Sequence, residues 1–332
     1  MTPATTRRRL LAGACTATAL AALPGLAGAQ AAAAWPDRPV TMIVPFPPGG
    51  VADTVARPVA EALARELGRP VVVENKAGAG GALGIGLAAR APADGYTVLL
   101  SLSSISILPE ADAVLQRKPG YTLGQFLPIA RFTADPTVLV VRAEAPWKTL
   151  ADFVADARKR PGAINYGSSG NYGTMHVPMA MLGHAAGLQL THIPYTGAGP
   201  AVLALIGGQV DAVASGPSTV VQHIRAGKLR ALAHWGEQPL AALPELPSLQ
   251  QAGYATRFAQ WSALFVPAGT PEAVVQRLRA AARKAAADPQ VLATIGKAGS
   301  PVDYLDAPEF QTYWDADARL MTEAVRQIGK LE

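Results

Sequence analysis

The sequence predicts an α/β protein with two lobes that are joined by a hinge and enclose a ligand cleft. Short apolar runs alternate with stretches of helical periodicity along most of the 332 residues, a pattern typical of sheets covered by helices. Two long extended runs, 126–141 and 258–266, flank the middle of the chain. We interpret them as segments that lead out to a second lobe and return. Lobe 1 is then 35–131 together with 258–332, and lobe 2 is 132–257.

Lobe 1 is predicted to begin with a strand–helix–strand–helix–strand unit. The strands are expected at 40–46, 71–75 and 96–102, with one helix after Gly50 through Leu67 and another from the Gly78–Gly81 turn to near Arg90. The third strand is apolar throughout, which indicates a buried parallel strand. Right-handed crossovers join such strands, and ligands bind at the carboxyl ends of the resulting parallel sheet.

Lobe 2 is predicted to repeat the alternation. The expected strands are 164–167, 190–195, 211–214 and 230–235, and the expected helices are 149–160, 174–186, 200–206 and 219–226. The chain then returns to lobe 1 and ends in helices. Thr270, Pro271 and Glu272 predict a helix start with an N-cap residue, a proline at the first position and an acid in the first turn.

The N-terminal segment has the features of an export signal. The basic run Arg7–Arg9 precedes an apolar stretch from Leu10 to Leu26, and small residues follow at 27–29. We therefore expect residues 1–29 to be removed as a signal peptide, through either the twin-arginine or the Sec route. An uncleaved membrane anchor is the alternative, although the apolar stretch is close to the lower length limit for spanning a bilayer.

Composition excludes several classes of protein. Hydrophobic residues make up 50% and charged residues 16% of the chain, which excludes a disordered or coiled-coil protein. The formal net charge of +5 includes the three arginines of the export signal, so no dense basic stripe for nucleic acid remains. Cys15 is the only cysteine and lies inside that signal, so the mature chain is expected to have neither a disulfide nor a thiol nucleophile.

Two glycine-bearing loops, each between a strand and a helix, predict an anion site. In the first, 45–53, Gly49 and Gly50 allow backbone amides to converge at a helix N-terminus. A tight turn in which Asp53 caps the helix is the structural alternative. The second loop, 165–176, adds hydroxyl donors from Ser168, Ser169 and Thr174.

The magnitudes favour a carboxylate ligand. Taking a carboxylate out of water costs several kcal/mol. About five donors at ~1.5–3 kcal/mol each and two helix ends at ~0.3–1 kcal/mol each could still leave the roughly −8 kcal/mol of micromolar binding. A third glycine turn, 195–201, could supply further donors or could simply connect two elements.

Catalytic, cofactor and metal sites find no support in the sequence. The spacing Gly-x-Gly-x-x-x-Gly at 78–84 is similar to a dinucleotide loop, but it follows the second strand and lacks the downstream acid. His176, His184 and His192 are spaced by eight residues and cannot chelate a metal from one helix. We expect His176 to hold its loop rather than to transfer protons. The remaining histidines are expected in capping or surface roles: His184, His192, His223 and His234.

Several motifs, in this order, resemble the Bug family, the periplasmic solute-binding proteins of tripartite tricarboxylate transporters. They are 35–39, 45–53, 73–81, 94–97, 165–168, 193–197, 207–211, 226–233 and 267–271. The resemblance covers nearly all of the mature chain. It implies a fold of the periplasmic binding protein type, in which a non-enzymatic, monomeric receptor closes on a small organic acid. It also implies a periplasmic location and transient delivery of that acid to membrane permease subunits.

The resemblance further implies which residues contact the ligand. On the lobe 1 side these are Phe46, Gly49, Gly50 and Asp53, and on the lobe 2 side Ser168, Ser169, Gly170, Thr174 and His176, with Tyr195 and Gly197 nearby. The sequence departs from the family pattern at 101–106 and 214–217, where Ser101, Ser103 and Ser215 are expected to face the far end of the ligand. A dicarboxylate, an amino acid and an aromatic acid therefore all remain open.

Two other functions are compatible with the same residues. One is a ligand sensor that signals through a membrane partner, and the other is a secreted α/β enzyme that acts on a carboxylate.

Overall fold

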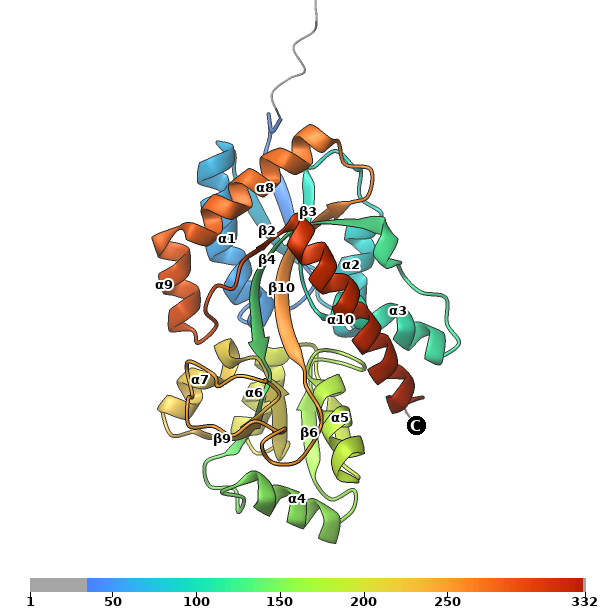
Figure 1. The fold of residues 1–332 in the computed structure, drawn as a ribbon, viewed down its shortest axis with the longest axis vertical. Coiled ribbons are helices and arrows are strands. Elements are labelled where there is room, and N and C mark those ends of the chain that lie inside the picture. The colour runs from blue at the N-terminus through green and yellow to red at the C-terminus, as the bar shows by residue number, and fades with distance from the viewer. Residues whose placement is uncertain (1–34, 331–332) are drawn as a thin grey trace, which may run out of the picture. The chain divides into compact units, whose positions relative to one another are not determined.

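Two β-sheets organise the chain (Figure 1). The computed structural model describes residues 35–330, and the signal peptide expected at 1–29 lies outside them. The first sheet has the strand order β11-β4-β10-β3-β1-β2. Its strands are β1 (Val40–Val44), β2 (Val71–Asn75), β3 (Thr97–Leu102), β4 (Phe126–Pro136), β10 (Ala259–Pro267) and β11 (Leu305–Asp306).

The first sheet is mixed rather than wholly parallel. β1 pairs in parallel with β2 and β3, as the sequence predicts. β10 runs antiparallel to both β3 and β4, and β11 runs antiparallel to β4. The reason is topological, because β10 returns from the second sheet and therefore enters the first sheet in the opposite direction.

The second sheet has the order β7-β6-β8-β5-β9. β6 pairs in parallel with β7 and β8, whereas β5 runs antiparallel to β8 and β9. The strands are β5 (Val138–Arg142), β6 (Asn165–Ser168), β7 (Thr191–Pro194), β8 (Ala212–Ser215) and β9 (Leu229–His234).

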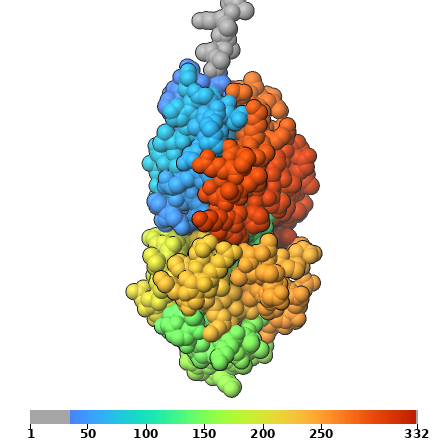
Figure 2. Space-filling model, turned by 90° about the vertical axis from the view of Figure 1, so that its left-hand side faces the viewer, coloured from blue at the N-terminus to red at the C-terminus, as the bar shows by residue number. Residues whose placement is uncertain are grey.

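Helices follow the strands of both sheets. Around the first sheet lie α1 (Val51–Leu67), α2 (Ala82–Ala89), α3 (Ser104–Val114), α8 (Glu272–Ala287), α9 (Pro289–Lys297) and α10 (Ala307–Ile328). With the second sheet belong α4 (Leu150–Lys159), α5 (His176–Ala186), α6 (Ala198–Ile206) and α7 (Pro217–Arg225). Helix α1 packs against α8 and α9 from the other end of the chain, so blue and orange atoms lie side by side in Figure 2.

One predicted extended run passes through both sheets. The run predicted as extended, 126–141, contains β4 and β5, which belong to different sheets. The change of sheet therefore falls at Thr137, later than the lobe boundary expected at residue 131, because β4 stays paired with β10 as far as Pro136 opposite Ala259.

One helix was not predicted and one cap prediction was wrong. The third strand ends at Leu102 as expected, and α3, which the sequence analysis did not predict, begins at Ser104. Thr270 does not cap α8, since its hydroxyl donates to the carbonyl of Pro267 at 2.7 Å and Pro271 stands at the N-cap.

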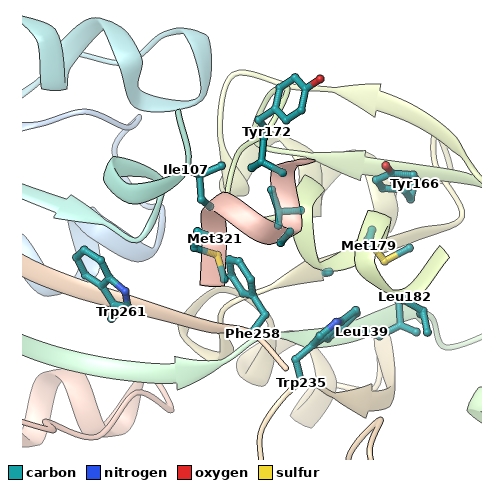
Figure 3. Packing of buried hydrophobic residues seen from close by; sticks show 14 of the residues in the cluster. Ile107, Leu139, Tyr166, Tyr172, Met179, Leu182, Trp235, Phe258, Trp261 and Met321 are labelled. Atoms are coloured by element: carbon teal, nitrogen blue, oxygen red, sulfur yellow. The ribbon is translucent and has the colours of Figure 1, made fainter. Parts of the chain in front are cut away.

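Side chains of both sheets share the largest buried hydrophobic cluster. It includes Leu99 and Phe265 from the first sheet and Leu139 and Tyr166 from the second. Figure 3 shows Phe258 beside Met321 of α10 in this cluster. No helix in the described part of the chain is long and apolar enough to cross a membrane.

Candidate functional site

The loop between β1 and α1 is held by the carboxylate of Asp53. This side chain is 4% exposed. Its Oδ2 accepts hydrogen bonds from Gly49 N and Arg57 Nε, each at 2.9 Å, and its Oδ1 accepts from Asn75 Nδ2 at 3.0 Å. Asn75 Nδ2 also donates to the carbonyl of Phe46 at 2.9 Å. Asp53 thus ties both ends of the loop to strand β2.

Asp53 remains ionised in this setting. Burial alone would raise its pKa, but the hydrogen bonds from Arg57, Gly49 and Asn75 outweigh burial, and the pKa falls below its ordinary value of 3.8. The helix N-cap is Gly50, with no side-chain cap. The carboxylate therefore fixes Gly49, which has a φ of +75°. The first-turn amides of α1, which have no acceptor within the helix, stay available as donors.

The loop between β6 and α5 is held differently. Ser168 Oγ accepts from Gly170 N at 3.1 Å and lies 2.5 Å from His192 Nε2. His176 Nδ1 accepts from Tyr172 N at 3.0 Å. The two imidazole rings stack with their centroids 4.2 Å apart.

Both imidazoles are neutral at pH 7. Burial, together with the smaller effect of the charge that His192 would carry, lowers the pKa of His176 to about 3. Burial lowers the pKa of His192 to about 4. Neutral rings can accept hydrogen bonds from the loop, so the geometry supports a loop-holding role for His176. His192, expected in a capping or surface role, belongs to the same stack.

The two loops and their neighbours meet at glycines. A Cβ atom on Gly197, the N-cap of α6, would lie 2.5 Å from the ring carbons Cγ and Cδ of Pro47. A Cβ atom on Gly170 would lie 3.0 Å from the backbone nitrogen of Gly80. At both places only a glycine lets the backbone of lobe 2 approach lobe 1 this closely.

A third approach involves a residue that the sequence analysis missed. A Cβ atom on Gly216 would lie 2.5 Å from Gln260 Oε1 and 3.0 Å from Val51 Cγ2. Gln260 Nε2 donates to Thr174 Oγ1 at 2.5 Å. Gln260 of β10 thus lies against two segments of the second lobe, at Thr174 and Gly216, and Gly216 in turn lies close to the start of α1.

Unpartnered polar atoms gather around these contacts. A Cβ atom on Gly81 would lie 3.3 Å from Ser104 Oγ and 3.1 Å from Cζ of the Phe46 ring. The buried atoms without a hydrogen-bond partner here are Ser103 Oγ, Ser104 Oγ, Ser169 Oγ and Gln260 Oε1. Each leaves a donor or an acceptor that a polar ligand can satisfy.

The remaining predicted residues fall into two groups. Tyr195 lines a groove of about 750 Å³ together with Ser169 and Gly170. Ser101 and Ser215 are buried but already bonded within the protein, Ser101 Oγ to the Leu102 carbonyl at 3.3 Å and Ser215 Oγ to Thr219 Oγ1 at 2.8 Å. Direct ligand contact by any of the predicted residues stays a prediction.

Four residues of this region were not among the predicted contacts: Gly80, Gly81, Ser104 and Gln260. The glycine spacing at 78–84 marks Gly80 and Gly81 in the sequence. It was compared with a dinucleotide loop and was not interpreted as a contact between the lobes. Ser104 lay within the departure at 101–106. No signal identified Gln260, whose position depends on the return of β10 from the second sheet.

Few charged side chains lie at this junction. Besides Asp53 and Arg57, Asp112 and Arg117 line the groove beside Ser169 and Gly170, and they pair with each other at 3.0 Å. Among the buried residues that the structure describes, Arg131 is the only lysine or arginine, and it is paired with Asp303 at 2.8 Å. The described residues contain no group of three or more side chains that could hold a metal ion. The buried donors available to a ligand in the described residues are therefore amides and hydroxyls.

The chain is similar to known receptors. Residues 55–329 match the sequence model of the tripartite tricarboxylate transporter family receptor. A UPF0065 protein from the tcbD-tcbE intergenic region of Pseudomonas sp. (strain P51) is 36% identical over 295 residues, which are 88% of this chain and 86% of that protein.

Two solved structures share the fold. The periplasmic binding protein BugD has a TM-score of 0.83 and 32% identity, covering 89% of this chain and 98% of BugD. MatC of Rhodopseudomonas palustris, solved with bound malate, has a TM-score of 0.78 and 31% identity, covering 88% and 98%. The fold and the receptor character predicted from the sequence are confirmed.

Proposed function

Because the chain belongs to the tripartite tricarboxylate transporter receptor family, we propose that it captures a small organic carboxylate between its two lobes and delivers it to permease subunits of such a transporter. The proposal includes export to the periplasm and binding without chemical conversion. MatC, which has the same fold, was solved with malate.

One observation carries the proposal. The loop before α1 and the glycine turn that opens α6 face each other at the Pro47–Gly197 contact. Helix N-termini carry partial positive charge and unsatisfied amides, so opposed N-termini form a seat for an anion. The neighbouring hydroxyls of Ser104 and Ser169 add donors without adding charge.

The chemistry at the junction favours a carboxylate over a bulkier or more highly charged anion. A carboxylate accepts about four hydrogen bonds around two oxygens, which amides and hydroxyls can satisfy. A phosphate monoester would bring about two charges to a region where the described buried residues offer no unpaired lysine or arginine.

A thermal-shift screen of the purified protein with mono-, di- and aromatic carboxylates tests the proposal, with malate as the first compound. Binding to the folded state raises the melting temperature by mass action. We expect at least one small carboxylate to do so and to be recovered unchanged, as checked by NMR of the ligand. No response from any carboxylate, or conversion of the one that binds, would contradict the proposal.

A further inference from the structure

A second cavity lies where the chain passes between the sheets. It has a volume of about 550 Å³, within the range of small-molecule sites. The end of β4 at Pro136, the start of β10 at Ala259 and the intervening segment at Gly236 line one side. Helix α10 lines another side with Tyr313, Ala316, Asp317, Leu320 and Met321, which share one helix face by their spacing.

The walls of this hinge cavity are largely aromatic and aliphatic. Trp235, Phe258 and Tyr313 contribute rings, and Leu320 and Met321 contribute aliphatic surface. Figure 3 shows Phe258 and Met321 next to each other, with Trp235 nearby. Aromatic faces attract cations as well as apolar groups.

The charged groups that line the hinge cavity are paired, with one exception. Arg131 binds Asp303 at 2.8 Å and lies over the Tyr313 ring at 4.4 Å. Arg257 pairs with Glu237 at the rim. Asp317 lines the cavity, is 8% exposed, and belongs to none of the ion pairs in the described part of the chain. Its Oδ2 is fully buried towards Trp261 and Ser106 and makes no hydrogen bond of standard geometry.

We propose that the hinge cavity binds a small organic ammonium ion with an apolar body, whose N–H groups donate to the Asp317 carboxylate and whose body packs against Trp235, Phe258 and Met321. The ammonium completes the hydrogen bonding of the one unpaired acid and neutralises it. This site is separate from the carboxylate seat, which lies at Pro47, Gly197 and Gly170.

The state of Asp317 makes the proposal sensitive to pH. Burial raises the pKa of Asp317 to about 7, although hydrogen bonding towards Trp261 and Ser106 and the charge of Arg131 act in the opposite direction. The charged groups facing the cavity from other elements, Arg131, Asp303, Arg257 and Glu237, pair with one another. An ammonium therefore binds more tightly as pH rises from 6 to 8 and Asp317 ionises, whereas a neutral ligand gains nothing from that ionisation.

Titration calorimetry of the purified protein with 2-phenylethylamine tests the proposal, and 2-phenylethanol serves as the uncharged control of similar size. We expect the amine to bind and the alcohol to bind about tenfold or more weakly, as loss of a charge-assisted hydrogen bond predicts. Absence of amine binding, or equal binding of both compounds, would overturn the assignment.

Two variants locate the binding. Asp317→Asn keeps the size of the side chain and should weaken amine binding about tenfold or more while removing its pH dependence. Leu320→Trp should fill the cavity from a residue that is 40% exposed, so that it tests the location without disturbing the core. Unchanged amine binding in both variants would place the amine elsewhere and end the proposal.

Discussion

Two loops at the candidate site, one from each lobe, are held by opposite means. The first, at 45–53, depends on an ionised carboxylate, because Asp53 binds Gly49, Arg57 and Asn75. The second, at 168–176, depends on two neutral imidazoles stacked 4.2 Å apart. Protonation would weaken both loops in opposite ways. Asp53 would lose the negative charge that holds the first loop, whereas the imidazoles of the second loop would gain a positive charge.

The two loops should therefore lose stability at different pH values as the solution becomes acidic. The pKa of Asp53 is lowered, so its stabilising contribution is present above 3.8 and is lost only as pH falls through the lower value of the folded state. The pKa of His176 is lowered to about 3, so the unfolded chain takes up a proton below about 6.5 while the folded chain does not. The second loop should fail first as pH falls.

Gly170→Val should have the largest effect, since it pushes the second loop away from the Gly78–Gly81 turn of lobe 1. Gly170 has a φ of +119°, and a side chain there would meet Gly80 N at 3.0 Å. Strain at such a backbone position costs about 1–3 kcal/mol. We expect carboxylate binding, measured by calorimetry, to weaken about tenfold or more.

Gly162→Val is the matched control for this change. Gly162 also has a positive φ, +76°, but a side chain there would meet only Thr191 Oγ1, at 4.0 Å. It should lose stability yet bind carboxylate as the wild type does. Equal losses of affinity in the two variants would mean that backbone strain, rather than the contact of Gly170 with Gly80, matters.

Asp53→Asn should come next. It removes charge-assisted hydrogen bonds to Gly49 and Asn75, and we expect about 2 kcal/mol of destabilisation in urea unfolding at pH 7. Arg57 is 53% exposed, so Arg57→Gln should cost no more than about 0.5 kcal/mol. The Asp53→Asn difference should shrink below pH 3.8. A difference that persists there would show that the side chain's shape, not its charge, holds the loop.

The alternation of short strands and helices was enough to predict most elements of both lobes from the sequence. Val71–Asn75 and Leu150–Lys159 form where the apolar patterns place them. Helix α3 was not predicted, because the serines at 104 and 106 and the proline at 109 are residues typical of loops. Its buried face follows from contact with α10, which no local pattern records.

The site was predictable in part, for a physical reason. Loops at the carboxyl ends of strands can be recognised locally, so Gly49, Gly170 and Gly197 were identified. Gln260 and Gly80 owe their places to contacts across the two lobes, with Thr174 and Gly170 respectively. Contacts between segments that are far apart in the chain produce no recognisable residue spacing in the sequence.

His176→Asn should sharpen the contrast in acid. The asparagine can still accept a hydrogen bond from Tyr172 N but cannot take up a proton, so the stability of the variant should depend less on pH below 6.5. For the wild type we expect a loss of up to about 2 kcal/mol at pH 5 from His176, at ~1.4 kcal/mol per pH unit. Urea unfolding at pH 7 and pH 5 measures the loss of stability in the wild type and in the variant. Equal losses of unfolding free energy between pH 7 and pH 5 in the two proteins would show that His176 does not cause the acid sensitivity.

The smallest effect should be that of salt on carboxylate affinity. Exposed cations lose their pull within a Debye length, which shortens from ~14 to ~4 Å between about 0.05 and 0.5 M salt. Amides at helix ends and buried hydroxyls act at hydrogen-bond distance, inside that length. Affinity should therefore change less than about twofold over this range, as calorimetry can show. A steep decline would mean that Arg57 or another exposed cation binds the ligand. Asp53 would then matter because it orients that cation, and the two loops would differ in how they bind and not only in how they are held.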